Sequence, residues 1–374
     1  MMKILYIQAN FGLGGINRIT SVKEDYLVEH GYEVHNLNTV EEDIVSPKGM
    51  YSEKIHLHFI YKKTLDRLHS IKVVGRLLRY IYLRYEFLRV LWQVRPDIIV
   101  CTQPTIEPLS IIFLTFWKKR VLEFQGWYCA TKKEQLTRLD KWYALTKYRI
   151  CHNVSLTSRE AKHFEELTGC HSLYINNANY MAFDRQTDGN SKQVLIISRL
   201  SPEKGIAEFI PAWKKVEVEH PDWRLAIYGK GPEENHIREV IRKNDLSHAE
   251  LHAYTTDVIS VYCESSITLL PSRFEGWGLT LIESMSLGVP CIAYDCPYGP
   301  SDIIRNGEDG FLTEYMNPDA MADKINYLIE HSEIRKQMGA RARINVQRFN
   351  VDRIMGQWMT LFENLKKGIF VQPD

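Results

Sequence analysis

The stretch ITLLPSRFEGWGLTLIESMSLGVPCIA, residues 267–293, decides the fold. A short apolar run at 267–270 leads through a loop with two glycines into a helical pattern at 279–287, and a second apolar run follows at 290–293. Two short strands joined through a helix are typical of a βαβ unit, whose strands are parallel. The loop and the helix also carry two glutamates, Glu275 and Glu283.

The same alternation extends along the chain and restarts after a polar segment, DRQTDGNSKQ, at 184–193. It predicts two doubly wound α/β domains, at 1–180 and 181–350, each built on a parallel sheet. Strands are predicted at 4–8, 33–37, 98–101, 121–124 and 154–157, then at 194–198, 224–228, 250–252, 267–270 and 290–293. Helices are predicted at 16–30, 106–117, 132–148 and 159–168, then at 203–217, 233–244, 279–287 and 351–367.

The charge balance argues against one class of function. The chain holds 47 Lys and Arg against 46 Asp and Glu, whereas domains that bind nucleic acids carry a basic excess. The charges are unevenly divided, because residues 1–178 have 25 basic against 18 acidic side chains and residues 179–374 have 22 against 28. We therefore expect no nucleic-acid partner and a positively charged first half.

The cysteines and the apolar runs indicate the compartment. None of the seven cysteines belongs to a C-x-x-C pair, so neither a zinc site nor a disulfide framework is expected. The N-terminal residues MMKILYIQAN enter a strand without a leader pattern, and the longest apolar stretch, 108–117, is too short to span a bilayer. We expect a cytoplasmic protein without a transmembrane anchor.

A glycine loop follows the first strand, at the edge of a parallel sheet where phosphates bind. Its sequence GLGGINR, residues 12–18, includes Gly14, Gly15 and Arg18. The spacing is not G-x-G-x-x-G and no acidic residue ends the second strand, so a dinucleotide site is disfavoured. A tight βα turn is the alternative interpretation.

The second half has a basic loop, ISRLSPEKGI, after strand 194–198. Ser201 and Pro202 suit the start of a helix, which places Lys204 in its first turn. A cation there opposes the helix dipole unless an anion is present. Arg199 and Lys204 therefore suggest a diphosphate site, with a solvated surface pair as the alternative.

The two glutamates border the amide groups that begin helix 279–287. A phosphate could bind these amides while Glu275 and Glu283 accept hydrogen bonds from hydroxyl groups on either side. The alternative is that both are surface acids, which helix N-termini favour.

The segments SRLSPEKG (198–205), FEGWGLTLIE (274–283), GVPCIAYDCPYGPSDII (288–304) and NGEDGFL (306–312) together resemble the second domain of family 4 retaining glycosyltransferases of GT-B architecture, of the bacterial polysaccharide, O-antigen and capsule type. GLGGINR resembles that family's first glycine loop. The resemblance implies two Rossmann-like domains facing a cleft, with the nucleotide-sugar donor on the second and the acceptor on the first. It also implies that helix 351–367 packs back onto the first domain.

The resemblance assigns roles to individual positions. Arg199 and Lys204 match the residues that bind the diphosphate, Glu275 the donor-sugar contact and Glu283 the ribose contact, so that Arg199, Lys204 and Glu275 are the catalytic candidates. The other donor-binding candidates are Gly14, Gly15, Tyr254, Thr255, Gly276, Gly278, Leu279 and Thr280.

One position departs from the family. Where many members carry a histidine after strand 121–124, this chain reads LEFQGWYC, with Gln125 in that place. An amide can bind a sugar hydroxyl but cannot carry a proton. Gln125, Arg18 and Trp127 are the acceptor-side candidates.

The resemblance implies transfer with retention and without an enzyme nucleophile. No D-x-D pair is present, so we expect neither a metal nor another cofactor. Within that family, the segment CPYGPSDII resembles members that use a UDP-hexose or UDP-N-acetylhexosamine donor more than members that use GDP-mannose. The alternatives are a synthase that uses a soluble sugar or sugar phosphate, and a non-catalytic subunit that binds a nucleotide sugar.

A basic stretch at 54–95 has ten Lys and Arg against two Asp and Glu, interleaved with leucines and aromatics. Cationic amphipathic helices are typical of contacts with anionic membrane surfaces. A lipid-linked glycan acceptor at such a surface would place the protein on the inner face of the plasma membrane. The alternative is an ordinary helix packed on the sheet, with a solvated basic face.

Overall fold

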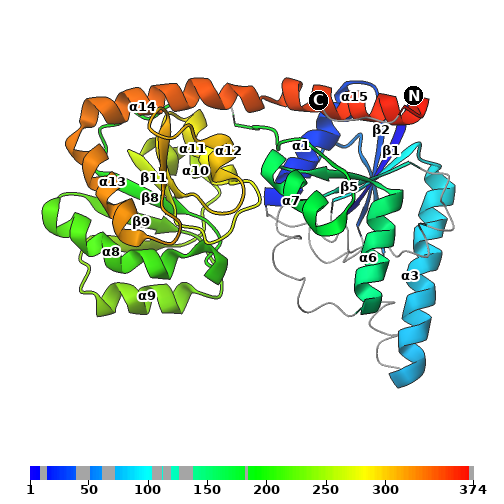
Figure 1. The fold of residues 1–374 in the computed structure, drawn as a ribbon, viewed down its shortest axis with the longest axis horizontal. Coiled ribbons are helices and arrows are strands. Elements are labelled where there is room, and N and C mark those ends of the chain that lie inside the picture. The colour runs from blue at the N-terminus through cyan, green and yellow to red at the C-terminus, as the bar shows by residue number, and fades with distance from the viewer. Residues whose placement is uncertain are drawn as a thin grey trace. The chain divides into compact units, whose positions relative to one another are not determined.

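The computed structural model (Figure 1) describes residues 1–8, 15–38, 51–60, 72–102, 112, 119–125, 138–181 and 184–369. The chain folds as two compact units: unit 1 is Met1–Ala178 with Val351–Asp374, and unit 2 is Asn179–Asn350. The first boundary lies two residues before the expected position. Asn179 and Tyr180 belong to unit 2 because they bond to its residues Ser286 and Glu283.

Unit 1 is built on a parallel sheet of seven strands in the order β3-β2-β1-β4-β5-β6-β7. The strands are β1 Lys3–Gln8, β2 Glu33–Asn38, β3 His56–Phe59, β4 Ile98–Cys101, β5 Lys119–Glu123, β6 His152–Ser155 and β7 Ser172–Tyr174. At the centre of the sheet, Ile7 of β1 pairs with Leu37 of β2 on one side and with Cys101 of β4 on the other. The β1 side chains alternate between the two faces, so each face has its own apolar core.

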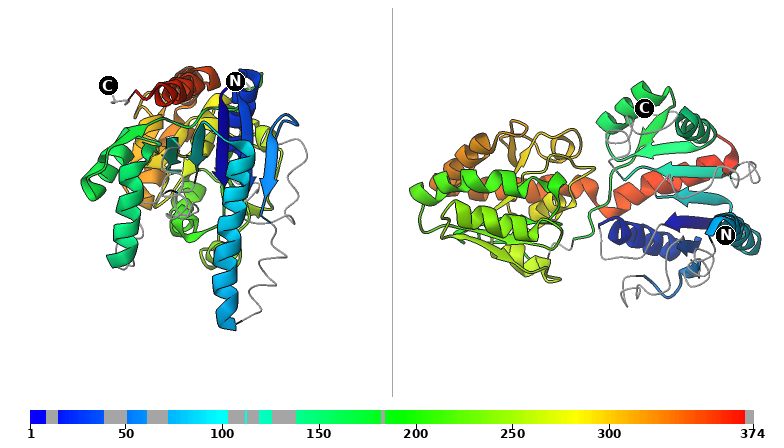
Figure 2. Two further views of the ribbon diagram at one scale, coloured as in Figure 1. Left: turned by 90° about the vertical axis from the view of Figure 1, so that its right-hand side faces the viewer. Right: turned by 90° about the horizontal axis from the view of Figure 1, so that it is seen from below.

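Helices cover both faces of this sheet. Leu27 of α1 (Gly15–Glu29) and Trp358 of α15 (Val351–Lys367) join one core with Ile4 and Val100. The other core contains residues of α3 (Lys72–Val94), α6 (Arg138–Ile150) and α7 (Ser158–Thr168). Figure 1 shows α15 on one side of the sheet and α3 and α6 on the other, and Figure 2 shows the same arrangement from two further directions.

Unit 2 is built on a parallel sheet of six strands in the order β10-β9-β8-β11-β12-β13. The strands are β8 Gln193–Ile197, β9 Arg224–Tyr228, β10 Ala249–His252, β11 Ile267–Leu270, β12 Cys291–Tyr294 and β13 Gly310–Thr313. The helices are α8 Ile206–Glu219, α9 Glu234–Lys243, α10 Val258–Cys263, α11 Leu279–Ser286, α12 Pro300–Ile303, α13 Pro318–Glu330 and α14 Ser332–Asn345, with 3-10 turns η1 at Pro202–Lys204 and η2 at Val346–Phe349. The two sheets confirm the predicted doubly wound α/β fold.

Several predicted boundaries differ from the structure, and the strands β3, β7 and β13 were not predicted. The strand predicted at 154–157 ends at Ser155, because Thr157 caps α7 by accepting a hydrogen bond from the Glu160 amide at 3.0 Å. Residues 56–59, counted within the basic stretch, form the edge strand β3. The helix predicted at 106–117 lies outside the described residues except for residue 112. None of the helices in the described ranges is both long enough and apolar enough to cross a membrane.

Candidate functional site

The start of α11 offers free backbone donors at the carboxyl end of the unit 2 sheet. Gly278 precedes the helix with φ +99°, a conformation that side chains other than glycine rarely adopt, and no side chain caps the helix. The first amides of a helix have no partner within it. Gly278, Leu279 and Thr280 thus form a backbone site suited to a phosphate.

Glu275, in the loop before α11, is held by two donors. Its side chain is buried, and Oε1 accepts hydrogen bonds from Lys204 Nζ at 2.6 Å and from Ser272 Oγ at 2.7 Å. Lys204 lies beyond β8 and Glu275 beyond β11, which are neighbouring strands. The strand order therefore brings together two residues that are 71 positions apart.

A close backbone contact joins the two loops that carry this pair. Gly205 has φ +62°, and a Cβ at that position would lie 2.2 Å from the carbonyl oxygen of Pro271. The Arg273 amide donates to the Glu203 carbonyl at 2.9 Å. Both contacts fix the 3-10 turn η1 against the loop after β11.

The predicted position of Lys204 was wrong. Lys204 ends the 3-10 turn Pro202–Lys204, and α8 begins only at Ile206, because the left-handed Gly205 interrupts the helical backbone. Lys204 therefore lies before α8 and not in its first turn. Its ammonium group pairs with the carboxylate of Glu275. Arg199 has another partner, Glu203, and 69% of its side chain is exposed. The structure thus gives the two cations separate partners.

Glu283 lies inside α11 and is also buried. Its Oε2 accepts a hydrogen bond from the Tyr262 hydroxyl at 2.8 Å, and its Oε1 accepts one from Tyr180. Burial, together with the nearby charge of Glu283, raises the pKa of Tyr262 well above its usual value. Tyr262 therefore keeps its proton and acts as a hydrogen-bond donor to Glu283.

Aromatic side chains lie at the carboxyl ends of β9 and β10. His252 stacks on Tyr228 with a centroid separation of 4.5 Å. Tyr254 is 40% exposed, and Lys230 Nζ lies 5.1 Å from its ring centroid. Thr255 caps the following turn by accepting from the Asp257 amide at 3.1 Å. These rings offer a flat surface on which a planar ligand can stack.

Several residues of this site were not predicted from the sequence: Ser272, Tyr180, Tyr262 and Cys296. Burial, with a smaller contribution from the charge of Glu275 and an opposing one from Lys204, raises the pKa of the Cys296 thiol to about 12. That thiol is therefore protonated beside the ion pair. A local signal existed only for Ser272, which stands three residues before Glu275 in the same loop.

The site candidates of unit 1, which are Gly14 and Gly15 for the donor and Arg18, Gln125 and Trp127 for the acceptor, are only partly described. Gly14 and Trp127 lie outside the described residues. Gly15 is the exposed first residue of α1, and Arg18 is half-buried one turn later. Gln125 follows β5, where its Nε2 donates to Glu123 Oε1 and its Oε1 accepts from Asn177 Nδ2 at 3.3 Å.

Two other features lie at the amino-terminal ends of the strands, away from the carboxyl ends that carry the candidate site. Within the described residues, Glu219, His220 and Glu330 have ligand atoms within 4.8 Å of one another, at the C-terminal ends of α8 and α13. In unit 1, a cavity of about 440 Å³ is lined by Arg149, His152 and His171, among others. Ligands of parallel sheets bind at the carboxyl ends of the strands, so we assign neither feature to the reaction.

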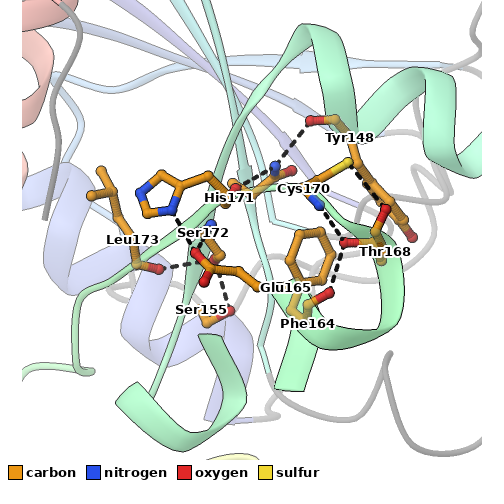
Figure 3. A network of polar contacts seen from close by, with 10 residues as sticks. Tyr148, Ser155, Phe164, Glu165, Thr168, Cys170, His171, Ser172 and Leu173 are labelled. Carbon is orange, nitrogen blue, oxygen red and sulfur yellow. Dashed lines mark hydrogen bonds and ion pairs between the residues drawn. The ribbon is translucent and has the colours of Figure 1, made fainter. Parts of the chain in front are cut away.

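The polar network beside that cavity is structural (Figure 3). Glu165 Oε1 accepts hydrogen bonds from His171 Nδ1 at 2.5 Å and from the Ser172 amide at 3.1 Å, and the hydroxyls of Ser155 and Ser172 are 3.0 Å apart. Glu165 belongs to α7 and Ser172 to β7. The network therefore fastens the end of α7 to the edge of the sheet.

Comparison with known proteins gives a family for most of unit 2. The model described as Glycosyl transferases group 1 matches residues 181–345. The chain is 33% identical over 217 residues to an exopolysaccharide phosphotransferase of Streptomyces coelicolor, a match that covers 57% of this chain and 23% of that protein. The chain thus spans less than a quarter of the length of that relative.

Two further comparisons extend over nearly the whole chain. The amylovoran biosynthesis glycosyltransferase AmsD of Erwinia amylovora is 26% identical over 356 residues, which covers 92% of this chain and 95% of that protein. The crystal structure of HepE from Anabaena in complex with UDP and glucose is similar with a TM-score of 0.79 at 17% identity, covering 97% of this chain and 100% of that one. These likenesses confirm the two-domain GT-B architecture implied by the sequence motifs.

Proposed function

We propose that this chain, whose residues 181–345 match the glycosyl transferases group 1 model, is a glycosyltransferase that builds a bacterial surface polysaccharide from a UDP-activated hexose or N-acetylhexosamine. The observation that carries the proposal is the buried contact between Lys204 and Glu275 beside the free amides of α11. The relative AmsD takes part in amylovoran biosynthesis, and the HepE structure contains UDP and glucose. Both support this choice of donor and product.

The donor would bind with its diphosphate on the amides of Gly278, Leu279 and Thr280, with Lys204 and Arg199 supplying positive charge. Both donors to Glu275 contact Oε1, which leaves Oε2 to accept a hydrogen bond from the donor sugar. Glu283 would accept from the ribose hydroxyls, and the base would lie near Tyr254 and Thr255. A carboxylate oxygen accepts more than one hydrogen bond, so the tyrosines need not leave Glu283.

In the transfer step, the bond between the sugar C1 and the diphosphate oxygen breaks, and an acceptor hydroxyl attacks C1 from the same side, which retains the configuration. Lys204, Arg199 and the helix amides stabilise the charge that develops on the departing diphosphate. The acceptor proton goes to an oxygen of that diphosphate. In this scheme the side chains supply the positive charge, so the proposal includes no metal.

Incubation of the purified protein with a panel of nucleotide sugars and a glycan acceptor tests the proposal. We expect one UDP-sugar to raise the melting temperature and to yield a product whose new linkage keeps the donor's anomeric configuration by NMR. EDTA should leave the rate within about twofold. Binding of a UDP-sugar without transfer to any acceptor would instead support a non-catalytic subunit.

We further propose that the acceptor is lipid-linked and that segment 54–95 contacts an anionic membrane surface. Leu78, Ile81, Tyr85 and Trp92 of α3 are exposed, Trp92 to 80%, and their spacing places them along one side of the helix. The ten basic residues of the segment match such a surface in charge. Exposed aromatic and basic side chains on one helix are typical of interfacial binding.

Sedimentation with liposomes tests this surface. We expect binding to liposomes that contain anionic lipid but not to neutral ones, with loss of binding when Lys62, Lys63 and Arg67 are neutralised or when Trp92 is replaced by serine. Ile344→Ser, at a residue of unit 2 with 69% exposure, is the matched control and should bind normally. Indifference to lipid charge would favour a soluble sugar or sugar-phosphate acceptor.

A further inference from the structure

The end of β5 in unit 1 holds a buried ion pair that the proposed transfer step does not use. Glu123 and Lys23 of α1 each have 1% of the side chain exposed, and Lys23 Nζ contacts Glu123 Oε1. Lys23 Nζ also lies 4.4 Å from the centroid of the Trp358 ring on α15. A buried ion pair is often no more stabilising than apolar side chains of similar volume. Stability alone therefore does not account for these charges.

The same carboxylate oxygen determines the orientation of Gln125. Gln125 Nε2 donates to Glu123 Oε1, and an ionised carboxylate can only accept hydrogen bonds. The amide nitrogen must therefore face Glu123. On the other side, Asn177 Nδ2 donates to Gln125 Oε1 at 3.3 Å. These contacts hold the carboxamide in one orientation and leave one N–H and one lone pair for a ligand.

Gln125 lies two residues after the carboxyl end of β5, at the sheet edge where ligands bind in this kind of fold. It is half-buried, whereas Glu123 and Lys23 are inaccessible. Within the described residues, Glu123 Oε2 has no hydrogen-bond partner. Gln125 is thus an accessible amide that is hydrogen-bonded to a buried carboxylate, Glu123, which in turn pairs with the buried Lys23.

We propose that Lys23, Glu123 and Asn177 are positioning residues that orient the Gln125 carboxamide to recognise a hydroxyl group of the acceptor sugar. This inference rests on the proposed sugar transfer. A fixed amide discriminates among acceptors because a sugar that lacks the matching hydroxyl leaves a polar group unpaired. If the Gln125 carboxamide could rotate freely, it could instead turn either its N–H or its oxygen toward the ligand and so match a hydrogen-bond acceptor or a donor equally well.

Steady-state kinetics of Glu123→Gln, with donor and acceptor varied separately, tests the proposal. The substitution keeps the shape of the side chain but lets an amide face Gln125, so that the Gln125 carboxamide can turn over. We expect the KM for the acceptor to rise about tenfold, the effect of losing roughly one hydrogen bond, while kcat and the KM for the donor stay within about threefold.

A double-mutant cycle separates positioning from general structural damage. Gln125→Ala should raise the acceptor KM similarly, and adding Glu123→Gln to it should have no further effect, because Glu123 acts through Gln125. Additive losses, or an unchanged acceptor KM in Glu123→Gln, would overturn the inference.

A second variant covers the case in which Glu123→Gln folds poorly. Lys23→Met combined with Glu123→Met removes both charges at similar volume, and should keep the melting temperature while raising the acceptor KM. A wild-type acceptor KM in this stable variant also contradicts the inference. If the unmodified protein transfers no sugar to any acceptor, the proposed function itself fails, and the inference with it.

Discussion

At the scale of single residues, the site consists of carboxylates that are each held by neighbouring donors. Glu275 accepts from Lys204 and Ser272, and Glu283 accepts from Tyr180 and Tyr262. Preorganised groups of this kind stabilise charge without reorganisation during the reaction. In the proposed donor site, both carboxylates therefore have fixed positions before a donor binds.

Replacement of Lys204 by alanine should reduce kcat by about a hundredfold, the usual effect of losing one preorganised electrostatic contact. The KM for the donor should change less than kcat, because the charge on the diphosphate grows in the transition state. Initial rates of UDP release measure both. Lys192→Ala, in the exposed pair with Asp222, is the control, and a Lys204→Ala rate near wild type would remove Lys204 from the mechanism.

Glu24 of α1 provides a prediction about pH. Burial raises the pKa of Glu24 well above its ordinary value of 4.5, although Asn36 opposes the shift by donating to Oε1 at 2.6 Å. The folded state thus keeps the proton to a higher pH than the unfolded state does, so stability falls as pH rises through 4.5 toward the folded pKa. Glu24→Gln should be nearly neutral at pH 4 and increasingly stabilising toward pH 8, as measured by urea unfolding. A stability difference between Glu24→Gln and the unmodified protein that does not vary with pH would contradict the raised pKa of Glu24.

At the scale of elements, the two loops of the donor site depend on a glycine contact. Gly205→Ala should destabilise the protein by more than about 3 kcal/mol, because it combines left-handed strain with a clash against Pro271. Gly307→Ala has similar strain, with φ +81°, but no atom within 4 Å of the added Cβ, and should cost about 1–2 kcal/mol. Urea unfolding compares the two, and equal losses would show that the contact with Pro271 is unimportant.

The same elements show what the sequence could predict. Most strands and helices, the glycine entry to α11 and the position of both glutamates follow from local patterns along the chain, whereas the edge strands β3, β7 and β13 were missed. The partners of the glutamates could not be predicted, because Lys204 reaches Glu275 across two neighbouring strands and Tyr180 reaches Glu283 from 103 positions away. The break at Gly205 was missed because a contact with a distant carbonyl, not local propensity, fixes its backbone.

At the scale of the molecule, unit 1 depends on the last described helix of the chain. Trp358 of α15 is fully buried among side chains of β1 and β4 and covers Lys23. Trp358→Ala should lower the free energy of unfolding of unit 1 by about 3–5 kcal/mol, whereas Gln357→Ala, at an exposed neighbour, should have little effect. Calorimetric titration with UDP should show unchanged affinity at a temperature where the variant is folded, because the proposed diphosphate site lies in unit 2, and weakened binding would show that UDP affinity depends on the packing of unit 1.

The division of the chain between the units has a consequence for biosynthesis. Unit 2 is continuous, from Asn179 to Asn350, whereas unit 1 combines residues 1–178 with a segment that contains α15 and is synthesised after unit 2. Domains generally fold as units while the chain grows. Unit 2 can therefore reach its native state during translation, while the nascent unit 1 exposes the apolar face that later receives Trp358, Leu361 and Phe362. That apolar face is covered only when α15 docks, so unit 1 cannot complete its core until unit 2 has been synthesised.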